Sequence, residues 1–260
     1  MHRRLFTLLG ILFFWAKGFA ATPEDLFRAG NEAFTAQQYE QAVAHYDSLL
    51  AQGYVSADLY YNLGNAHFRL NHLSQALLSY ERALKLNPQH ADAAFNLRLA
   101  NLRVVDRLET VPDFFLTASI RNFVQGRNSS QWAVTALVLL WLALAGGTLV
   151  LFGKASIWKR IGFFGGITLC VLSLGSLTLS LTRHDAETRS DWGIVLTPNA
   201  YVKAAPGGQT DLLILHEGAK VETLGREGDW MKVRVPVQDD KLGEVVDIIG
   251  YVPGEAIEEI

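Results

Sequence analysis

The side chains that could carry chemistry in this sequence are seven histidines, one cysteine and a group of carboxylates near the C-terminus. No two histidines form an HxxxH pair, and none stands with a carboxylate at metal-ligand spacing. Neither a phosphate-binding glycine loop nor a GxSxG motif is present. The carboxylates of residues 239–247 match no calcium-binding loop, and their pattern is typical of a solvated hairpin tip. We therefore expect no enzymatic activity, no catalytic residue, no metal site and no cofactor.

The distribution of charge excludes further functions. The net charge is −3, but residues 183–260 hold 15 acidic and 8 basic side chains, whereas residues 21–131 hold 11 and 9. Neither segment has the basic field that nucleic acid would require. The only cysteine, Cys170, lies in an apolar run, so no disulfide framework is expected. Without a reaction centre, we expect protein partners and no small-molecule substrate.

Two apolar runs, residues 132–152 and 161–181, contain no charged side chain. As a helix, each would be about 31 Å long, which is enough to cross a bilayer core. Only residues 153–160 separate them, so the sequence predicts a helical hairpin in a membrane. The alternative, two buried helices of a soluble protein, is disfavoured because both runs exceed the length typical of buried core helices.

The ends of the hairpin can be oriented from flanking charges. Lys154, Lys159 and Arg160 make the turn between the runs cationic, which favours a cytoplasmic turn. Residues 1–20 have a charged start, a short apolar core and small residues before a cleavage point after Ala20, as an export signal does. We therefore expect a bacterial inner-membrane protein with two spans and both soluble segments in the periplasm.

The segment before the hairpin repeats with a period of 34 residues. In the unit that begins at Ala57, the pattern residues are Tyr60, Leu63, Gly64, Ala76, Tyr80, Ala83 and Pro88. This unit resembles a tetratricopeptide repeat (TPR), with His67 where a tyrosine is usual. A weaker unit begins at Pro23, and a single further helix follows Pro88. We predict two repeats and a terminal helix that shields the end of the stack; a simple α-helical bundle is the alternative.

The TPR resemblance implies which side chains face a protein-binding groove. By repeat position these are Phe27, Asn31, Tyr61, Asn62, Asn65, Phe95 and Asn96, whereas Phe34 and Phe68 are expected to pack within the stack. Asn31 and Asn62 match asparagines of TPR domains that bind a peptide's C-terminal carboxylate. The cations of such a clamp are absent, because Phe27, Asp92 and Asn96 stand at their positions. We expect the groove to prefer an internal, partly apolar segment.

Residues after the hairpin change from helical periodicity to short alternating segments separated by Gly, Pro and Asp. Their order resembles a bacterial SH3-like barrel, with Trp230 after a Gly-Asp turn and Tyr251 in the closing strand. Trp230 is expected in the core, because so small a barrel needs its aromatic side chains inside.

Small residues recur every four positions in the apolar runs. Gly162, Gly166 and Cys170 do so in the second run, and Ala143 and Gly147 in the first. Such spacing allows close approach of helices. We predict a helix contact at Gly162 and Gly166, formed either within the hairpin or with a partner subunit.

The predicted fold class is multi-domain: an all-α TPR solenoid, a two-helix transmembrane hairpin and an all-β SH3-like barrel. The predicted divisions are a signal peptide (1–20), the TPR domain (21–108), an amphipathic linker (109–131), the first span (132–152), a cytoplasmic turn (153–160), the second span (161–181) and the SH3-like domain (182–260).

This order of parts resembles BatE, the TPR protein of bacterial Bat (aerotolerance) operons. The resemblance implies membrane-anchored von Willebrand A-domain proteins as partners, together with a MoxR-type ATPase. From the residues we expect a membrane-anchored adaptor with two protein-binding modules. The alternatives are an envelope protein that binds peptidoglycan through its SH3-like domain and a sensor, although the eight-residue turn leaves no room for a cytoplasmic output domain.

Overall fold

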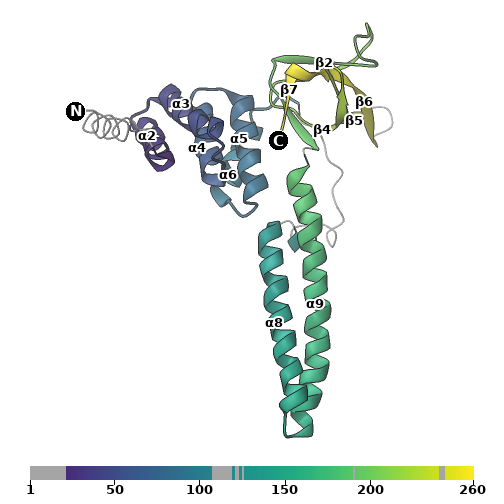
Figure 1. The fold of residues 1–260 in the computed structure, drawn as a ribbon. Helices are drawn as coiled ribbons and strands as arrows, with labels where there is room; N and C mark the ends of the chain where they lie inside the picture. Colours follow the sequence, from purple (N-terminus) through teal and green to yellow (C-terminus); the bar gives the residue numbers. More distant parts are fainter. Residues whose placement is uncertain (1–21, 107–118, 121–122, 125, 190, 240–243) are drawn as a thin grey trace, which may run out of the picture.

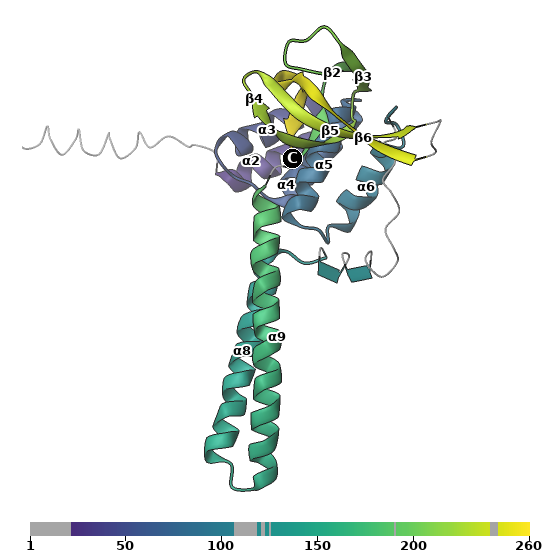
Figure 2. The same ribbon diagram turned by 90° about the vertical axis from the view of Figure 1, so that its right-hand side faces the viewer.

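The computed structural model describes residues 22–106, 119–120, 123–124, 126–189, 191–239 and 244–260, and within them the chain forms a helical stack, a long hairpin and a sheet (Figure 1). The predicted signal peptide and most of the predicted amphipathic linker lie outside these ranges. Both views place the stack and the sheet at the same end of the hairpin (Figure 2). The helices of the stack are α2 (Pro23–Thr35), α3 (Tyr39–Ala51), α4 (Ala57–Arg69), α5 (Leu73–Leu86) and α6 (Ala91–Asn101).

Helix pairs in the stack are held by a glycine in the first helix and a tyrosine ring in the second. A Cβ atom at Gly64 would lie 2.7 Å from the Tyr80 ring, and one at Gly30 would overlap the Tyr46 ring. Both rings are about 1% exposed. The close approach predicted at Gly64 is therefore confirmed, and it recurs one repeat earlier. We call α2, α4 and α6 the A helices and α3 and α5 the B helices.

His67 stands where the repeat usually has tyrosine, and its surroundings oppose protonation. Its Nδ1 is buried and has no hydrogen-bond partner among the described residues, and the His72 ring lies 5.7 Å away. Burial, and secondly the charge of His72, lower the pKa of His67 from 6.5 to about 4.

We expect acid to destabilise the stack through His67. Because its folded pKa is depressed, the unfolded chain binds the proton first, so stability is complete above about pH 6.5 and falls as the pH approaches 4. After allowance for partial exposure, the loss is about 1–2 kcal/mol. Thermal unfolding between pH 7 and 4.5 measures it, with His67→Tyr as the comparison. An equal pH dependence in that variant would contradict the prediction.

The hairpin consists of α8 (Ser129–Phe152) and α9 (Ser156–Thr188). By length and composition, both helices could span a membrane. Residues 153–155 join them, because Lys159 and Arg160 continue α9 instead of remaining in the turn. Asn128 caps α8: its side chain accepts a hydrogen bond from the Gln131 backbone, and the Gln131 side chain accepts one from Asn128.

Small side chains of α9 pack against the backbone of α8. Ser173, Ser176 and Ser180 are buried, and each Oγ donates a 2.8 Å hydrogen bond to a main-chain oxygen of α8, those of Ala136, Trp132 and Ser129 respectively. These bonds satisfy hydroxyl groups that lipid could not.

The glycines predicted at a helix contact continue this row. A Cβ at Gly162 would overlap the carbonyl oxygen of Gly146 in α8, and one at Gly166 would lie 3.4 Å from that of Ala143. Cys170, which shares their four-residue spacing, is exposed. The row continues instead through half-buried Leu169 to Ser173, since helices that wind about each other repeat every 3.5 residues.

All pairings in the sheet are antiparallel, in the order β3-β2-β6-β5-β4-β1-β7. The strands are β1 (Trp192–Val195), β2 (Asn199–Lys203), β3 (Asp211–His216), β4 (Lys220–Glu227), β5 (Trp230–Asp239), β6 (Glu244–Pro253) and β7 (Ile257–Glu259), with a short 3-10 helix, η1 (Gly254–Ala256). β3 and β7 are the two edges. The sheet is therefore open, and the predicted closed SH3-like barrel is not confirmed.

Alternation along the strands decides which aromatic side chains enter the sheet's core. Met231 is 3% exposed and Val252 is fully buried, and both belong to the core cluster. Their neighbours Trp230 and Tyr251 point to the opposite face and are only half-buried. The expectation that Trp230 lies in the core was wrong, because Met231 takes the inward position.

The stack and the sheet share a buried core. Ile194 of β1 is 1% exposed and belongs to the same cluster as Leu77 of α5 and Val104. At Gly218, φ is +87°, and a Cβ would lie 2.9 Å from Leu77 and 3.1 Å from Val104. Glycine is needed there both for this conformation and for the close approach.

Polar contacts reinforce this shared core. The Glu217 carboxylate accepts hydrogen bonds from the Ser74 backbone N–H (3.2 Å) and Oγ (2.8 Å), and so satisfies a donor in the first turn of α5. Lys220 forms a 2.8 Å ion pair with Glu81 of the same helix. The sheet therefore completes the packing of α5, and the TPR segment alone lacks part of its core.

Candidate protein-binding groove

The A helices are linked to one another by asparagine side chains. Asn31 Oδ1 of α2 accepts hydrogen bonds from Tyr46 Oη (2.7 Å) and from Asn62 Nδ2 of α4 (3.0 Å). One repeat later, Asn65 Oδ1 of α4 accepts from Tyr80 Oη and Asn96 Nδ2 of α6, both at 2.8 Å. We call each set an Asn–Tyr–Asn cluster; the members of the second lie 34 residues after those of the first.

The tyrosines fix the orientation of the amides. Burial raises the pKa of Tyr46 to about 12, and it raises the pKa of Tyr80 further. Both hydroxyls therefore stay protonated and donate, so Asn31 and Asn65 must present their oxygens. This leaves their amino groups, and the oxygens of Asn62 and Asn96, without a printed bond to another described residue. Such paired donors and acceptors suit an extended peptide backbone.

An apolar pocket adjoins the second Asn–Tyr–Asn cluster. Its volume is about 250 Å³, and it is lined by Phe34, Asn65, Phe68, Arg69, Tyr80, Asn96 and Leu99. The lining comes from α2, α4 and α6 as well as from α5. The pocket is large enough for one aliphatic or aromatic side chain of a bound segment.

The other predicted groove residues do not all reach this pocket. Phe27 is half-buried, and its ring centroid lies 6.1 Å from that of Tyr46. Tyr61 packs against Tyr80 and lies 4.7 Å from the His90 ring. Phe95 is 59% exposed on α6 beneath the Arg98 guanidinium. Phe27 and Tyr61 thus contribute to packing, and Phe95 faces outward.

Two of the aromatic side chains expected only to pack, Phe34 and Phe68, also line the pocket. Sequence reasoning missed Arg69, Tyr80 and Leu99 as lining residues. Arg69 could have been found, because arginine recurs 34 residues later at Arg103.

The groove therefore has cations, although not at the positions of a carboxylate clamp. The Arg69 guanidinium lies 5.1 Å from the Tyr39 ring centroid, and that of Arg103 lies 5.4 Å from Phe68. Stacking of this kind holds each guanidinium over an aromatic face. No group of three or more His, Cys, Asp or Glu residues in the described part of the chain is placed to hold a metal ion.

Comparison with known proteins decides the nature of the repeat. The family model of the tetratricopeptide repeat matches residues 57–90. The chain contains a tetratricopeptide repeat. No curated protein matches the sequence.

Solved structures of TPR proteins are also similar to this chain. One is YrrB, described as a TPR protein with an unusual peptide-binding site; it is 18% identical, with a TM-score of 0.32, over 70% of this chain and 86% of YrrB. Another is MamA, which is 16% identical, with a TM-score of 0.30, over 64% of this chain and 80% of MamA.

Proposed function

We propose that this protein is a membrane-anchored adaptor that binds an internal, partly apolar segment of a partner protein in its TPR groove. The observation that carries the proposal is the pair of Asn–Tyr–Asn clusters beside the apolar pocket. The clusters supply fixed backbone donors and acceptors, and the pocket supplies a place for one side chain. No reaction centre is needed for this function.

The hairpin supports the anchoring. Its apolar faces are exposed, as shown by Trp141 at 71% and Phe164 at 66%, and the soluble parts lie at one end. We infer two spans in a bacterial inner membrane, with the cationic turn in the cytoplasm and both soluble parts in the periplasm. Following the resemblance to BatE, the partners are von Willebrand A-domain membrane proteins in a Bat/MoxR-type complex linked to aerotolerance or envelope stress. In this proposal the sheet is an SH3-like module that supports the groove.

The two asparagines of each cluster differ as probes of binding. Removing Asn31 or Asn65 leaves a buried tyrosine hydroxyl without its acceptor, which costs about 1–3 kcal/mol of stability. Removing Asn62 or Asn96 leaves the tyrosine bond intact. Asn62→Ala and Asn96→Ala therefore test binding with little effect on folding.

We expect Asn62→Ala and Asn96→Ala each to weaken binding of the full-length protein to the exported part of a von Willebrand A-domain partner. The loss of one or two hydrogen bonds to the peptide backbone is about 1–1.5 kcal/mol, or roughly tenfold in Kd. Titration calorimetry in detergent measures it, and Asn101→Ala, an exposed position on α6, is the matched control.

Two outcomes would count against the groove. The first is unchanged affinity in both variants when thermal unfolding shows them folded. The second is a salt dependence as steep as that of a clamp with several cations, because only Arg69 among the pocket residues is charged.

A further inference from the structure

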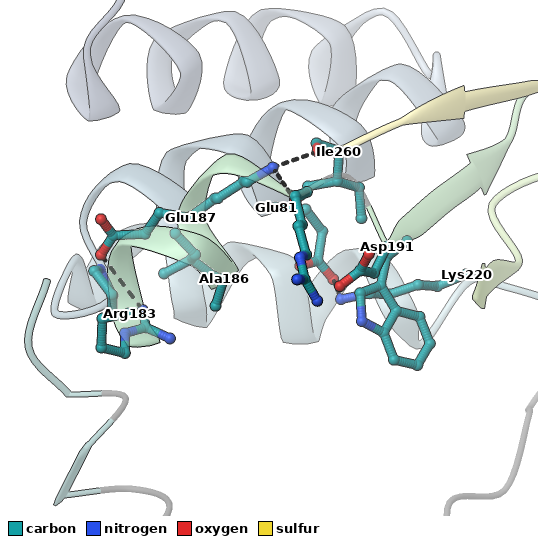
Figure 3. Close-up of a pocket in the computed structure, with 12 residues that line it drawn as sticks. Glu81, Arg183, Ala186, Glu187, Asp191, Lys220 and Ile260 are labelled. Atoms are coloured by element: carbon teal, nitrogen blue, oxygen red, sulfur yellow. Dashed lines mark hydrogen bonds and ion pairs between the residues drawn. The ribbon is translucent and has the colours of Figure 1, made fainter. Parts of the chain in front are cut away.

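A second cavity lies where the helical stack, the sheet and the hairpin meet (Figure 3). Its volume is about 360 Å³. Side chains of α5, of the last turns of α9 and of β1 line it, together with Lys220 and Ile260. The charged members are Lys85, Arg183, Arg189 and Lys220, and Glu81, Glu187 and Asp191, so the cations exceed the carboxylates by one.

Arg183 is the cation of this cavity whose charge is least satisfied. Its side chain is 15% exposed, and its Nε is buried without a hydrogen-bond partner among the described residues. The nearest carboxylate, that of Glu187, is 3.8 Å from Nη2, beyond hydrogen-bond distance. Glu187 is engaged elsewhere, by the backbone N–H and hydroxyl of Ser129. A guanidinium this deeply buried is costly unless something accepts its hydrogen bonds.

The remaining cations surround the same space. Lys85 Nζ donates to the carbonyl oxygens of Arg189 and Ile260 at 2.8 Å. Burial, and secondly the Arg82 charge, lower the pKa of Lys85, which shows that this ammonium is short of negative charge. Lys220 lies 5.4 Å from the Trp192 ring centroid, at the far end of the cavity from Arg183 (Figure 3).

The cavity lies just beyond the apolar part of α9. Leu181, which is 63% exposed, ends the apolar run, and Arg183 follows two residues later, or roughly 3 Å further along the helix. At the outer end of a membrane span this is the level of lipid headgroups, where arginine and tryptophan are favoured. Any phospholipid beside the hairpin brings a phosphate to this height.

We propose that this cavity binds the phosphate of an anionic phospholipid headgroup, with Arg183 as its main contact and Arg189 as a second. A guanidinium can donate two parallel hydrogen bonds to phosphate oxygens, and Arg183 has the unused donor for this. The bound lipid would connect the hairpin to α5 and thus to the TPR repeats. The inference rests on the proposed membrane anchoring.

The test is native mass spectrometry of the full-length protein in a nonionic detergent. Three probes are compared: short-chain phosphatidylglycerol, diacylglycerol with the same acyl chains but no phosphate, and inorganic phosphate. We expect saturable binding of one phosphatidylglycerol per chain, and much weaker binding of the other two probes.

Arg183→Gln should lower the affinity for phosphatidylglycerol at least tenfold, and Arg189→Gln, which alters a more exposed side chain, about threefold. Arg160→Gln, at the other end of α9, is the matched control and should change nothing. If Arg183→Gln does not fold, the Arg189 variant and the probe comparison still decide.

Equal binding of diacylglycerol, or unchanged affinity in both cavity variants, overturns the site. Binding of inorganic phosphate without binding of lipid overturns the choice of a lipid. The anchoring is tested separately by carbonate extraction of cell membranes. Release of the protein would contradict the proposed function, whereas a retained protein with no lipid preference contradicts only the cavity.

Discussion

Replacing Ile194 with alanine is expected to destabilise the helical stack and the sheet together, by about 2–5 kcal/mol. Ile194 belongs to the sheet in sequence, but its buried neighbours Leu77 and Val104 belong to the stack. The substitution leaves a cavity at this junction, which neither part can fill alone.

Hydrogen exchange of the purified full-length protein measures this effect. We expect amides of α5 and of β1 to lose protection in parallel, because the two elements share one core. Leu224→Ala is the control, since Leu224 lies on β4 of the same sheet but is 37% exposed, and it should change stability by less than about 0.5 kcal/mol. Loss of protection in β1 with α5 unaffected would show that the two parts fold independently.

Periodicity predicted the helices well, because each depends on local sequence. The 34-residue repeat placed α4 and α5 and the glycine against the tyrosine ring, and the length of the apolar runs predicted the two long helices. The strands were likewise predictable from alternation. Whether the sheet closes depends on pairing between distant segments, and the sequence pattern does not determine it.

The candidate groove was predictable only in part. Repeat positions identified Asn31, Asn62, Asn65 and Asn96 but assigned them to the ligand alone. In the structure each also bonds to its own repeat or the next, and the signal was available as asparagine and tyrosine recurring at a distance of 34.

Contacts between the separate parts could not be predicted in this way. Glu217 reaches Ser74 across 143 residues of sequence. No local propensity or period encodes such a contact, so the joining of stack and sheet, and the cavity that holds Arg183, emerged only from the structure.

Gly162→Leu is expected to prevent correct assembly of the hairpin. Any Cβ at this position would overlap the carbonyl oxygen of Gly146, which belongs to backbone and cannot move aside as a side chain could. A leucine must therefore separate α8 from α9. Separation near the turn also strains the hydrogen bonds of Ser173, Ser176 and Ser180, which are worth about 0.6 kcal/mol each in membrane proteins.

The glycines of the hairpin supply their own controls. Gly166→Leu should be milder, because a Cβ there lies 3.4 Å from the Ala143 oxygen, at the edge of ordinary contact. Gly165→Leu and Gly175→Leu should be tolerated, since a Cβ at either meets nothing within 4 Å. The measurement is the yield of monodisperse full-length protein in detergent and its resistance to proteolysis in the hairpin.

The ranking of these variants separates two roles for the small residues. If they serve the hairpin itself, damage follows the distance to α8, so that Gly162 exceeds Gly166, and Gly166 exceeds Gly165. If they serve a partner subunit, Gly147→Leu, on the open side of α8, should abolish co-purification of that partner while the yield stays normal. Equal yields for Gly162→Leu and Gly165→Leu would contradict the close contact between α8 and α9, and with it the packing that holds this hairpin together.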